Sequence, residues 1–124
     1  MEIKNFFFDS YAIIEIVKGN PKYIKYIDTE IILTEFNLPE ITSSILNDFG
    51  EEKAREAYQK FSECTVQISE EVLIEALKFR KENKKRELSY TDCIGYIYAK
   101  KHKLLFLTGD EQFKDKENVE FVKK

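Results

Sequence analysis

Residues 3–10 of the chain read IKNFFFDS, a short apolar run that leads directly into an acid and a hydroxyl. Three consecutive phenylalanines favour a strand over residues 3–8 that is buried on both faces, as strands of helix-covered parallel sheets are. A helix is expected to follow from about Ser10 and to end at Gly19. The opening of the chain therefore indicates an α/β fold.

The rest of the chain repeats this alternation of short apolar runs and segments with helical spacing. Further strands are expected at residues 30–34, 65–68, 104–108 and 119–122, and further helices after the caps Asn20, Ser69 and Ser89, around residues 38–49 and around residues 54–61. Strands separated by helices indicate a mostly parallel central sheet with helices on both faces. All 124 residues are expected to form one domain, 1–124.

The start of the helix around residues 38–49 has two interpretations, because Pro39 must lie near it. If Asn37 caps the helix, Pro39 falls in the first turn, where proline is tolerated. If the helix begins at Glu35, Pro39 must kink it. The choice also decides whether Glu40 or Glu35 is the acid that this helix offers to a site.

Composition excludes several classes of protein. Hydrophobic residues make up 43% of the chain and aromatic residues 14%, which is too apolar for a disordered protein. The apolar runs are too short to span a bilayer, and Asp9 and Glu15 interrupt the first of them, so neither a membrane protein nor a signal peptide is expected. Cys64 and Cys93 are too few for a disulfide scaffold, so we expect a cytoplasmic protein.

The few histidines and glycines narrow the possible chemistry. His102 is the one histidine of the chain and lies among lysines, where a solvated residue near a helix C-terminus is expected. A closed zinc site and a serine or cysteine nucleophile with a histidine base are therefore disfavoured. The glycine-rich phosphate-binding motifs are absent from the sequence. Any catalysis must use carboxylates, hydroxyls and a metal.

Four acids follow predicted strands or open predicted helices. Asp9 follows the first strand and Asp110 a later one, whereas Glu40 and Asp92 lie early in helices. Sites in open α/β sheets form outside the carboxyl ends of the strands, so all four acids are expected at one rim. Clustered carboxylates repel one another unless a cation joins them, and an all-oxygen ligand set favours Mg²⁺ or Mn²⁺.

Position alone leaves a structural alternative for three of these acids. The chain has 23 acidic residues, so acids at the ends of elements are common by chance. Asp9 fits a helix cap, Asp92 the first turn of a helix, and Asp110 a turn after Gly109. From position alone, a shared acidic site and three separate caps remain equally open.

Four motifs in order carry a family resemblance that spans nearly the whole chain. They are DS at 9–10 after the apolar strand, the segment 34–40 that ends in Glu40, LSYTD at 88–92, and LTGDEQF at 107–113. Together they resemble the PIN domain, the nuclease fold of VapC-type toxins and RNA-processing factors. Gln112 departs from the family pattern, where many relatives carry a further acid, and Glu111 is a candidate substitute.

The resemblance implies a PIN-like three-layer α/β/α sandwich with a metal-dependent endoribonuclease site. Asp9, Glu40, Asp92 and Asp110 would be catalytic and would hold Mg²⁺ or Mn²⁺, with Ser10 and Thr108 orienting Asp9 and Asp110 behind them. A helix start and a strand end would explain the two hydroxyls equally well. Glu35 and Glu111 are open as further contributors to the site.

The implied function is cleavage of RNA by a VapC-like toxin that a small antitoxin protein neutralises. Two alternatives stay open within the same resemblance. One is an RNA-maturation or ribosome-associated nuclease, and the other is a PIN interaction module with weak or no catalysis. The presence of all four acids disfavours the interaction module.

Charge is unevenly spread along the chain. Residues 1–77 carry 7 basic and 15 acidic groups, a net of −8, whereas residues 78–103 carry 9 and 3, a net of +6. Because an acidic centre repels phosphates, nearby positive charge is needed to hold RNA. Lys84, Lys85 and Arg86 are the predicted RNA-binding residues, and the next candidates are Lys100, Lys101 and Lys103.

An interface with a second copy of the chain is expected near its N-terminus. Tyr23, Ile24, Tyr26 and Ile27 crowd a short helix that a small sheet cannot easily cover on all sides. Surplus apolar surface of this kind is typical of an interface, and it predicts a homodimer. The alternative is that all four side chains pack into the core.

Overall fold

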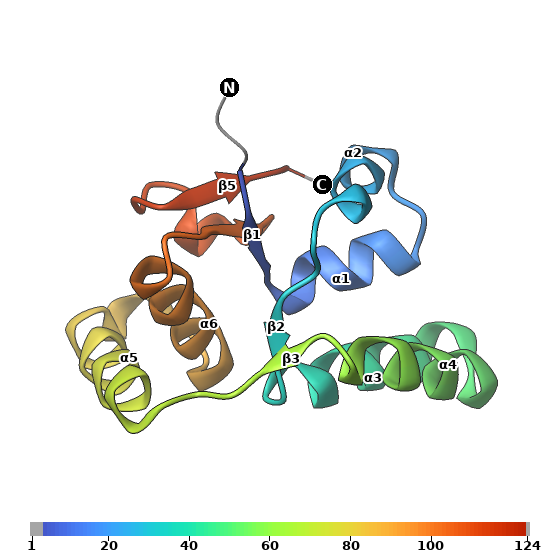
Figure 1. Cartoon of the computed structure of the whole chain (residues 1–124), viewed down its shortest axis with the longest axis horizontal. Helices are drawn as coiled ribbons and strands as arrows, with labels where there is room; N and C mark the ends of the chain where they lie inside the picture. Colours follow the sequence, from blue (N-terminus) through green and yellow to red (C-terminus); the bar gives the residue numbers. More distant parts are fainter. Residues whose placement is uncertain (1–3, 124) are drawn as a thin grey trace.

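The structure, a computed structural model, describes residues 4–123 of the chain (Figure 1). Within this range the strands are β1 (Phe6–Phe8), β2 (Leu33–Thr34), β3 (Thr65–Val66), β4 (Leu105–Thr108) and β5 (Val119–Phe121). The α-helices are α1 (Ser10–Val17), α2 (Pro21–Ile24), α3 (Asn37–Phe49), α4 (Glu51–Ser62), α5 (Glu70–Glu82) and α6 (Tyr90–Lys101). Three short 3₁₀ turns, η1 (Lys25–Asp28), η2 (Lys84–Arg86) and η3 (Glu111–Phe113), complete the regular structure.

The strands are all parallel and form two ladders, β1-β4-β5 and β2-β3. Phe7 lies opposite Phe106 in the larger ladder. The two ladders meet where the Phe8 amide donates a hydrogen bond of 2.8 Å to the carbonyl of Ile32, just before β2. The predicted α/β class and parallel sheet are confirmed.

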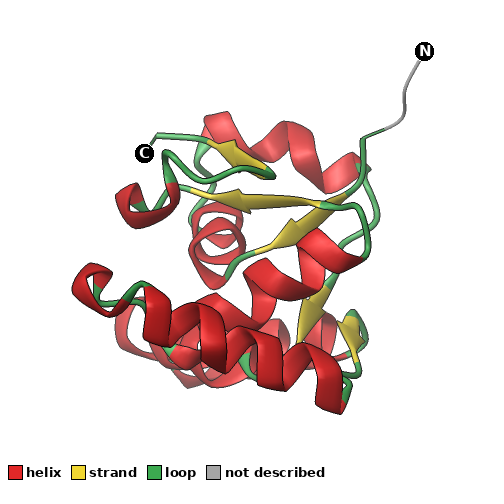
Figure 2. Cartoon of the chain, turned by 90° about the vertical axis from the view of Figure 1, so that its left-hand side faces the viewer, coloured by secondary structure: helices red, strands yellow, loops and turns green. Residues whose placement is uncertain are grey.

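Helices cover the sheet on two sides. Figure 1 shows α5 and α6 on one side of β1, and α1, α3 and α4 on the other, and Figure 2 shows the strands between these helices. Phe7 and Phe8 are fully buried between the layers, as the apolar run predicts. Gly95 lets α6 approach the strands closely, because a Cβ there would lie 2.6 Å from the Phe7 ring. The middle of β1 therefore packs directly against the second turn of α6.

Two strands are shorter than the sequence predicts. The expected strands 30–34 and 65–68 contribute only the two-residue strands β2 and β3. Ile31 and Ile32 pack against the core, but a single hydrogen bond to β1 does not make a ladder. Residue 3 of the predicted first strand lies outside the described residues, and the strand itself begins at Phe6.

The helix α3 begins at Asn37, which places Pro39 in the first turn without a kink. The predicted cap is wrong, however, because Phe36 occupies the cap position and makes no side-chain capping bond. Asn37 is instead the first helical residue and is 1% exposed. Glu40 lies in the first turn, so this helix start offers Glu40 rather than Glu35. Among residues 4–123, no helix has the length and apolarity that a membrane span requires.

Candidate active site

The four candidate acids come from four different elements that end or begin at one place. Asp9 follows β1, and its amide donates a hydrogen bond of 3.1 Å to the carbonyl of Leu107 in β4. Asp110 follows the same strand β4, whereas Glu40 and Asp92 lie in the first turns of α3 and α6. Parallel strands thus deliver two acids, and helix starts deliver the other two, to the same end of the sheet.

Asp9 is the most buried of the four, with 3% of its surface exposed. One carboxylate oxygen accepts a 2.9 Å hydrogen bond from the Ser10 amide, and the other accepts one of 2.7 Å from the hydroxyl of Thr108. Burial raises the pKa of Asp9 well above its ordinary value, and the charges of Asp92 and Glu40 raise it further. The fold therefore holds this carboxyl rigidly in a place that disfavours its charge.

Glu40 is tied to the sheet through a relay of buried polar side chains. The Ser10 hydroxyl donates a 2.6 Å hydrogen bond to Glu40 Oε1, and Asn37 Nδ2 donates one of 2.8 Å to that hydroxyl. Asn37 Oδ1 in turn accepts from the amide and the hydroxyl of Thr34, each at 2.9 Å. Partial burial raises the pKa of the Glu40 carboxyl, and the charge of Asp92 adds to this.

This relay changes the roles assigned to the two hydroxyls. Thr108 touches both of its expected partners, because its hydroxyl donates to Asp9 and accepts a 3.0 Å hydrogen bond from the Asp110 amide. Ser10 contacts Asp9 only through its backbone amide, and its hydroxyl serves Glu40. Asn37 was not predicted from the sequence as a site residue. The one feature of the sequence that points to a buried role for Asn37 is its place as a polar residue between the apolar Phe36 and Leu38.

Asp92 belongs to a capping box as well as to the acid cluster. Its carboxylate accepts a 3.1 Å hydrogen bond from the Ser89 amide, and its own amide donates one of 3.0 Å to the Ser89 hydroxyl. Burial raises the pKa of Asp92, the bonds to Ser89 lower it, and the charge of Asp110 raises it. Asp92 therefore caps its own helix and also lies within reach of the charges of the other acids.

Asp110 is positioned by the turn that leaves β4. Asp110 caps η3, because its carboxylate accepts a 3.0 Å hydrogen bond from the Gln112 amide inside that turn. Gly109 is required before it, because any Cβ there would collide with the Tyr11 and Tyr23 side chains. Glu111 points to solvent and pairs with Lys114 at 4.0 Å, outside the cluster.

The four acids are coupled to one another and to no cation. The charges of the cluster raise the pKa of Asp9, Glu40 and Asp92, and Asp110 contributes through Asp92. Among residues 4–123, no ion pair involves any of the four. Neither Glu35 nor Glu111 contributes to these shifts. The cluster therefore concentrates carboxyl groups whose charge no ion pair within residues 4–123 offsets.

Three carboxylate oxygens of the cluster are of the kind that a divalent metal binds. Glu40 Oε2, Asp92 Oδ1 and Asp110 Oδ2 have no hydrogen-bond partner within the described part of the chain. In that same part, no three acids are close enough to form a ready-made metal group. The four carboxylates would therefore have to draw together around Mg²⁺ or Mn²⁺, which prefer such oxygen ligands.

Comparison with known proteins shows the family of the chain. The family model of the PIN domain matches residues 6–119. The chain belongs to the PIN domain family. No curated protein sequence matches it.

Solved structures share the fold of this PIN domain at low sequence identity. A toxin–antitoxin complex from Klebsiella pneumoniae is 18% identical, with 97% of this chain and 100% of that chain covered and a TM-score of 0.75. VapC20 of Mycobacterium tuberculosis, a toxin that cleaves the sarcin-ricin loop, is 14% identical, with 97% and 100% covered and a TM-score of 0.77. VapBC2 of Rickettsia felis, bound to a DNA fragment of its promoter, is 12% identical, with 96% and 98% covered and a TM-score of 0.72.

The three basic residues that are predicted to bind RNA differ in whether an acid already pairs with them. Lys84 and Lys85 are exposed in η2 and join no ion pair among residues 4–123. Arg86 instead forks onto Asp115, with N···O distances of 2.7 and 2.9 Å, and donates to the carbonyl of Gln112 at 2.8 Å. Arg86 therefore ties the segment before α6 to the turn after β4, and its charge is already matched.

The remaining basic candidates lie at the other end of α6 from Asp92. Lys100 pairs with Glu117 at 2.7 Å, and Lys101 lies 3.1 and 2.9 Å from two glutamates of α5. Lys103 is exposed. His102 follows the last residue of α6 and stacks on Tyr98, as expected of a residue near a helix C-terminus.

The early apolar group is divided between core and surface. Tyr23 and Tyr26 are buried, and their hydroxyls donate to the Val122 carbonyl and to Glu120 at 2.6 and 2.7 Å. Ile24 and Ile27 are 40% and 45% exposed. The expectation that all four side chains pack into the core is therefore wrong for Ile24 and Ile27. The expectation of surplus apolar surface holds only for these two side chains.

Proposed function

We propose that this PIN domain is a Mg²⁺- or Mn²⁺-dependent endoribonuclease and the toxin of a toxin–antitoxin pair. The observation that carries the nuclease activity is the acid cluster, in which four carboxylates from four elements share one end of the sheet. Family membership supports this interpretation, and so do the toxins among the structural relatives. The proposed site of action is the cytoplasm, with RNA as substrate and a small antitoxin protein as partner.

The residues of the cluster would form the metal site by drawing together from positions that hydrogen bonds define. Asp9 is fixed by two hydrogen bonds, Asp92 by its capping box, and Glu40 by the Ser10 hydroxyl. A bound metal would lower the pKa of a coordinated water, so that hydroxide forms near neutral pH, and would offset charge on the phosphate. No histidine base is needed in such a site.

A cleavage assay tests this proposal. Labelled single-stranded RNA is incubated with the purified protein in Mn²⁺, in Mg²⁺ and in excess EDTA, and products are separated on a gel. We expect cleavage with metal and none with EDTA. Asp92→Asn should cut at least about 100-fold more slowly, because a metal ligand is lost.

Glu52→Gln is the matched control, since it removes an exposed acid in the first turn of α4, outside the cluster. Its rate should equal that of the wild type. Cleavage by Asp92→Asn at the wild-type rate would contradict the assignment of the site.

A further inference from the structure

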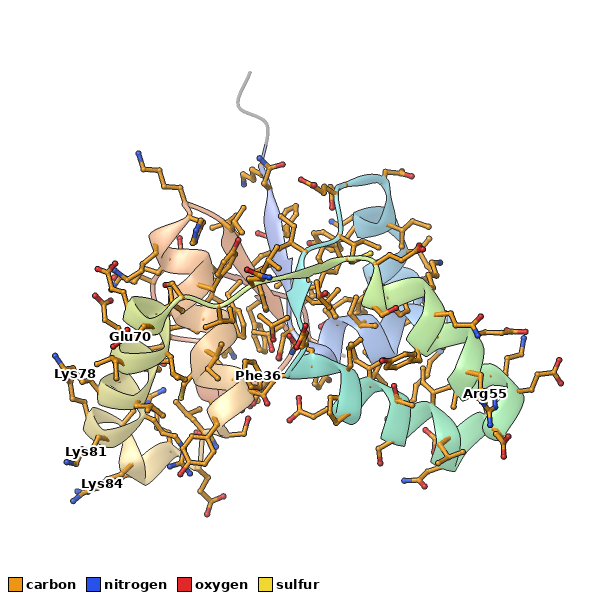
Figure 3. All side chains as sticks on the ribbon, turned by 60° about the horizontal axis from the view of Figure 1, so that its bottom comes forward. Phe36, Arg55, Glu70, Lys78, Lys81 and Lys84 are labelled. Carbon is orange, nitrogen blue, oxygen red and sulfur yellow. The ribbon has the colours of Figure 1, made fainter. Side chains whose placement is uncertain are left out.

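Two exposed aromatic side chains lie at the openings of the helices that carry acids. Tyr90 is the first residue of α6, two positions before Asp92, and is 59% exposed. Phe36 directly precedes α3, four positions before Glu40, and is 48% exposed. The Thr91 hydroxyl donates a 3.4 Å hydrogen bond to the Phe36 carbonyl and so joins the two helix starts. Figure 3 shows Phe36 at the junction of the α5–α6 side and the α3–α4 side.

The Tyr90 ring is held from behind by a cation. The guanidinium carbon of Arg80 lies 4.1 Å from the ring centroid, and Arg80 Nε donates a 2.8 Å hydrogen bond to the Leu88 carbonyl. Among residues 4–123, Arg80 joins no ion pair, so no acid there offsets its charge. Tyr90 is thus an exposed ring of fixed orientation with a positive charge beneath it.

Phe36 borders a hollow next to the segment that leads from β3 to α5. The hollow measures about 300 Å³ and is lined by apolar side chains, among them Val66, Ile68 and Leu73. Gln67 and Glu35 also border it, and both are exposed and able to bond polar edges. A flat group with polar edges would therefore find both an apolar face and hydrogen-bonding partners beside Phe36.

We propose that Tyr90, backed by Arg80, and Phe36 form a subsite that stacks unpaired nucleobases of RNA beside the acid cluster. The substrate class rests on the proposed nuclease function. The α-carbons of Tyr90 and Asp92 are at most about 7 Å apart, a distance that one nucleotide bridges. Bases stack on aromatic side chains in single-stranded RNA recognition, with little dependence on sequence.

The charge at this surface favours RNA over a protein partner. An acidic cluster repels phosphates, so RNA needs a cation close to the acids, and Arg80 supplies one beneath Tyr90. Lys84 and Lys85 extend the positive charge from the end of α5. An apolar protein segment could cover the two rings, but it would gain nothing from the uncompensated guanidinium.

The test is RNA binding without cleavage. Metal-free protein in EDTA is titrated into a short single-stranded RNA that carries 2-aminopurine, whose fluorescence falls when the base stacks. Tyr90→Leu and Phe36→Leu each keep an apolar side chain but remove a ring, and each should weaken binding by roughly 5- to 100-fold and abolish part of the quenching. Tyr90→Phe keeps the ring and should bind like the wild type.

Tyr58→Leu is the control, because Tyr58 is a comparably exposed tyrosine on α4, 50% accessible. Its affinity and quenching should equal those of the wild type. Unchanged RNA affinity in both leucine variants would overturn the inference. This holds even if the same variants weakened a complex with an antitoxin, because the two rings would then serve a protein partner and not RNA. Since the assay contains no metal, a protein that binds through these rings but never cleaves would contradict only the nuclease activity.

Discussion

Asp92 stabilises α6 through its capping box and at the same time places a charge beside Asp9 and Glu40. A carboxyl whose folded pKa lies above its unfolded pKa binds protons more tightly in the folded state. Without metal, the fold therefore gains stability as the pH falls through the raised pKa values and loses it as the pH rises. Replacing one acid by its amide removes both the cost of burying its charge and its repulsion with the other acids.

We expect Asp92→Asn to raise the Tm of the metal-free protein at pH 7. The amide oxygen can still accept from Ser89, so the cap survives while one charge disappears. Relief of ~1 kcal/mol of burial cost and repulsion together raises the Tm by roughly 4 °C. Thermal melts in EDTA at pH 7 and pH 4.5 would measure this, and the gain should shrink at pH 4.5 as the wild-type acids take up protons. A lower Tm than that of the wild type at pH 7 would contradict the repulsion.

Asn37 is the buried link between Thr34 and the Ser10 hydroxyl that holds Glu40. Asn37→Ala should lower the free energy of unfolding by about 1–3 kcal/mol, because the Thr34 amide and hydroxyl lose their acceptor. Denaturant unfolding measures the change. Asn47→Ala, an exposed position on the same helix, should change stability little, and equal effects of the two would contradict the relay.

The sequence predicts a helix or strand correctly where the residues of that segment alone determine it. The apolar run of β1 and the Ser89 cap of α6 can each be inferred from neighbours in sequence, whereas the position of Pro39 stayed open until the structure placed the start of α3 at Asn37. The lengths of β2 and β3 could not be predicted in this way. A strand ends where its partner strand stops pairing with it, and the partner is remote in sequence.

In the candidate site, too, some residues can be predicted from their neighbours in sequence and others cannot. Asp9 and Asp110 follow strands and were predictable, whereas the place of Asn37 depends on Thr34 and Ser10 across the fold. The match of Arg86 with Asp115 spans 29 positions, and no local pattern indicates it.

The 3₁₀ turn η2 should bind RNA through its two unpaired lysines rather than through Arg86. Replacing Lys84 and Lys85 by Ala should reduce the slope of log affinity against log salt by about 1.4, since each lysine on single-stranded RNA releases ~0.7 counterion. Titrations of metal-free protein at several salt concentrations measure this. Replacing Lys53 and Lys60 of α4 is the charge-matched control. An unchanged slope in the first variant would place the RNA elsewhere, with Lys103 the next candidate.

For the whole molecule, Ile24 and Ile27 are the apolar side chains of the early helical segment that the core leaves exposed. We expect a homodimer through this face at tens of micromolar protein, an order typical of weak dimers (~10 µM). Sedimentation velocity should show a dimer for the wild type and a monomer for Ile24→Lys combined with Ile27→Lys. Leu46→Lys, at an exposed position of α3, is the control. A wild-type protein that stays monomeric would remove this interface.

Whether the acid cluster binds a divalent metal can be measured by titrating Mn²⁺ into metal-free protein in a calorimeter at pH 7. The wild type should bind with defined stoichiometry, and the affinity should fall as the pH is lowered, because protons compete for carboxyls whose pKa is raised. Asp92→Asn should bind at least about 10-fold more weakly, whereas Glu52→Gln should match the wild type. Equal Mn²⁺ affinity in the wild type and Asp92→Asn, or no binding by the wild type, would contradict a metal site built from these four acids.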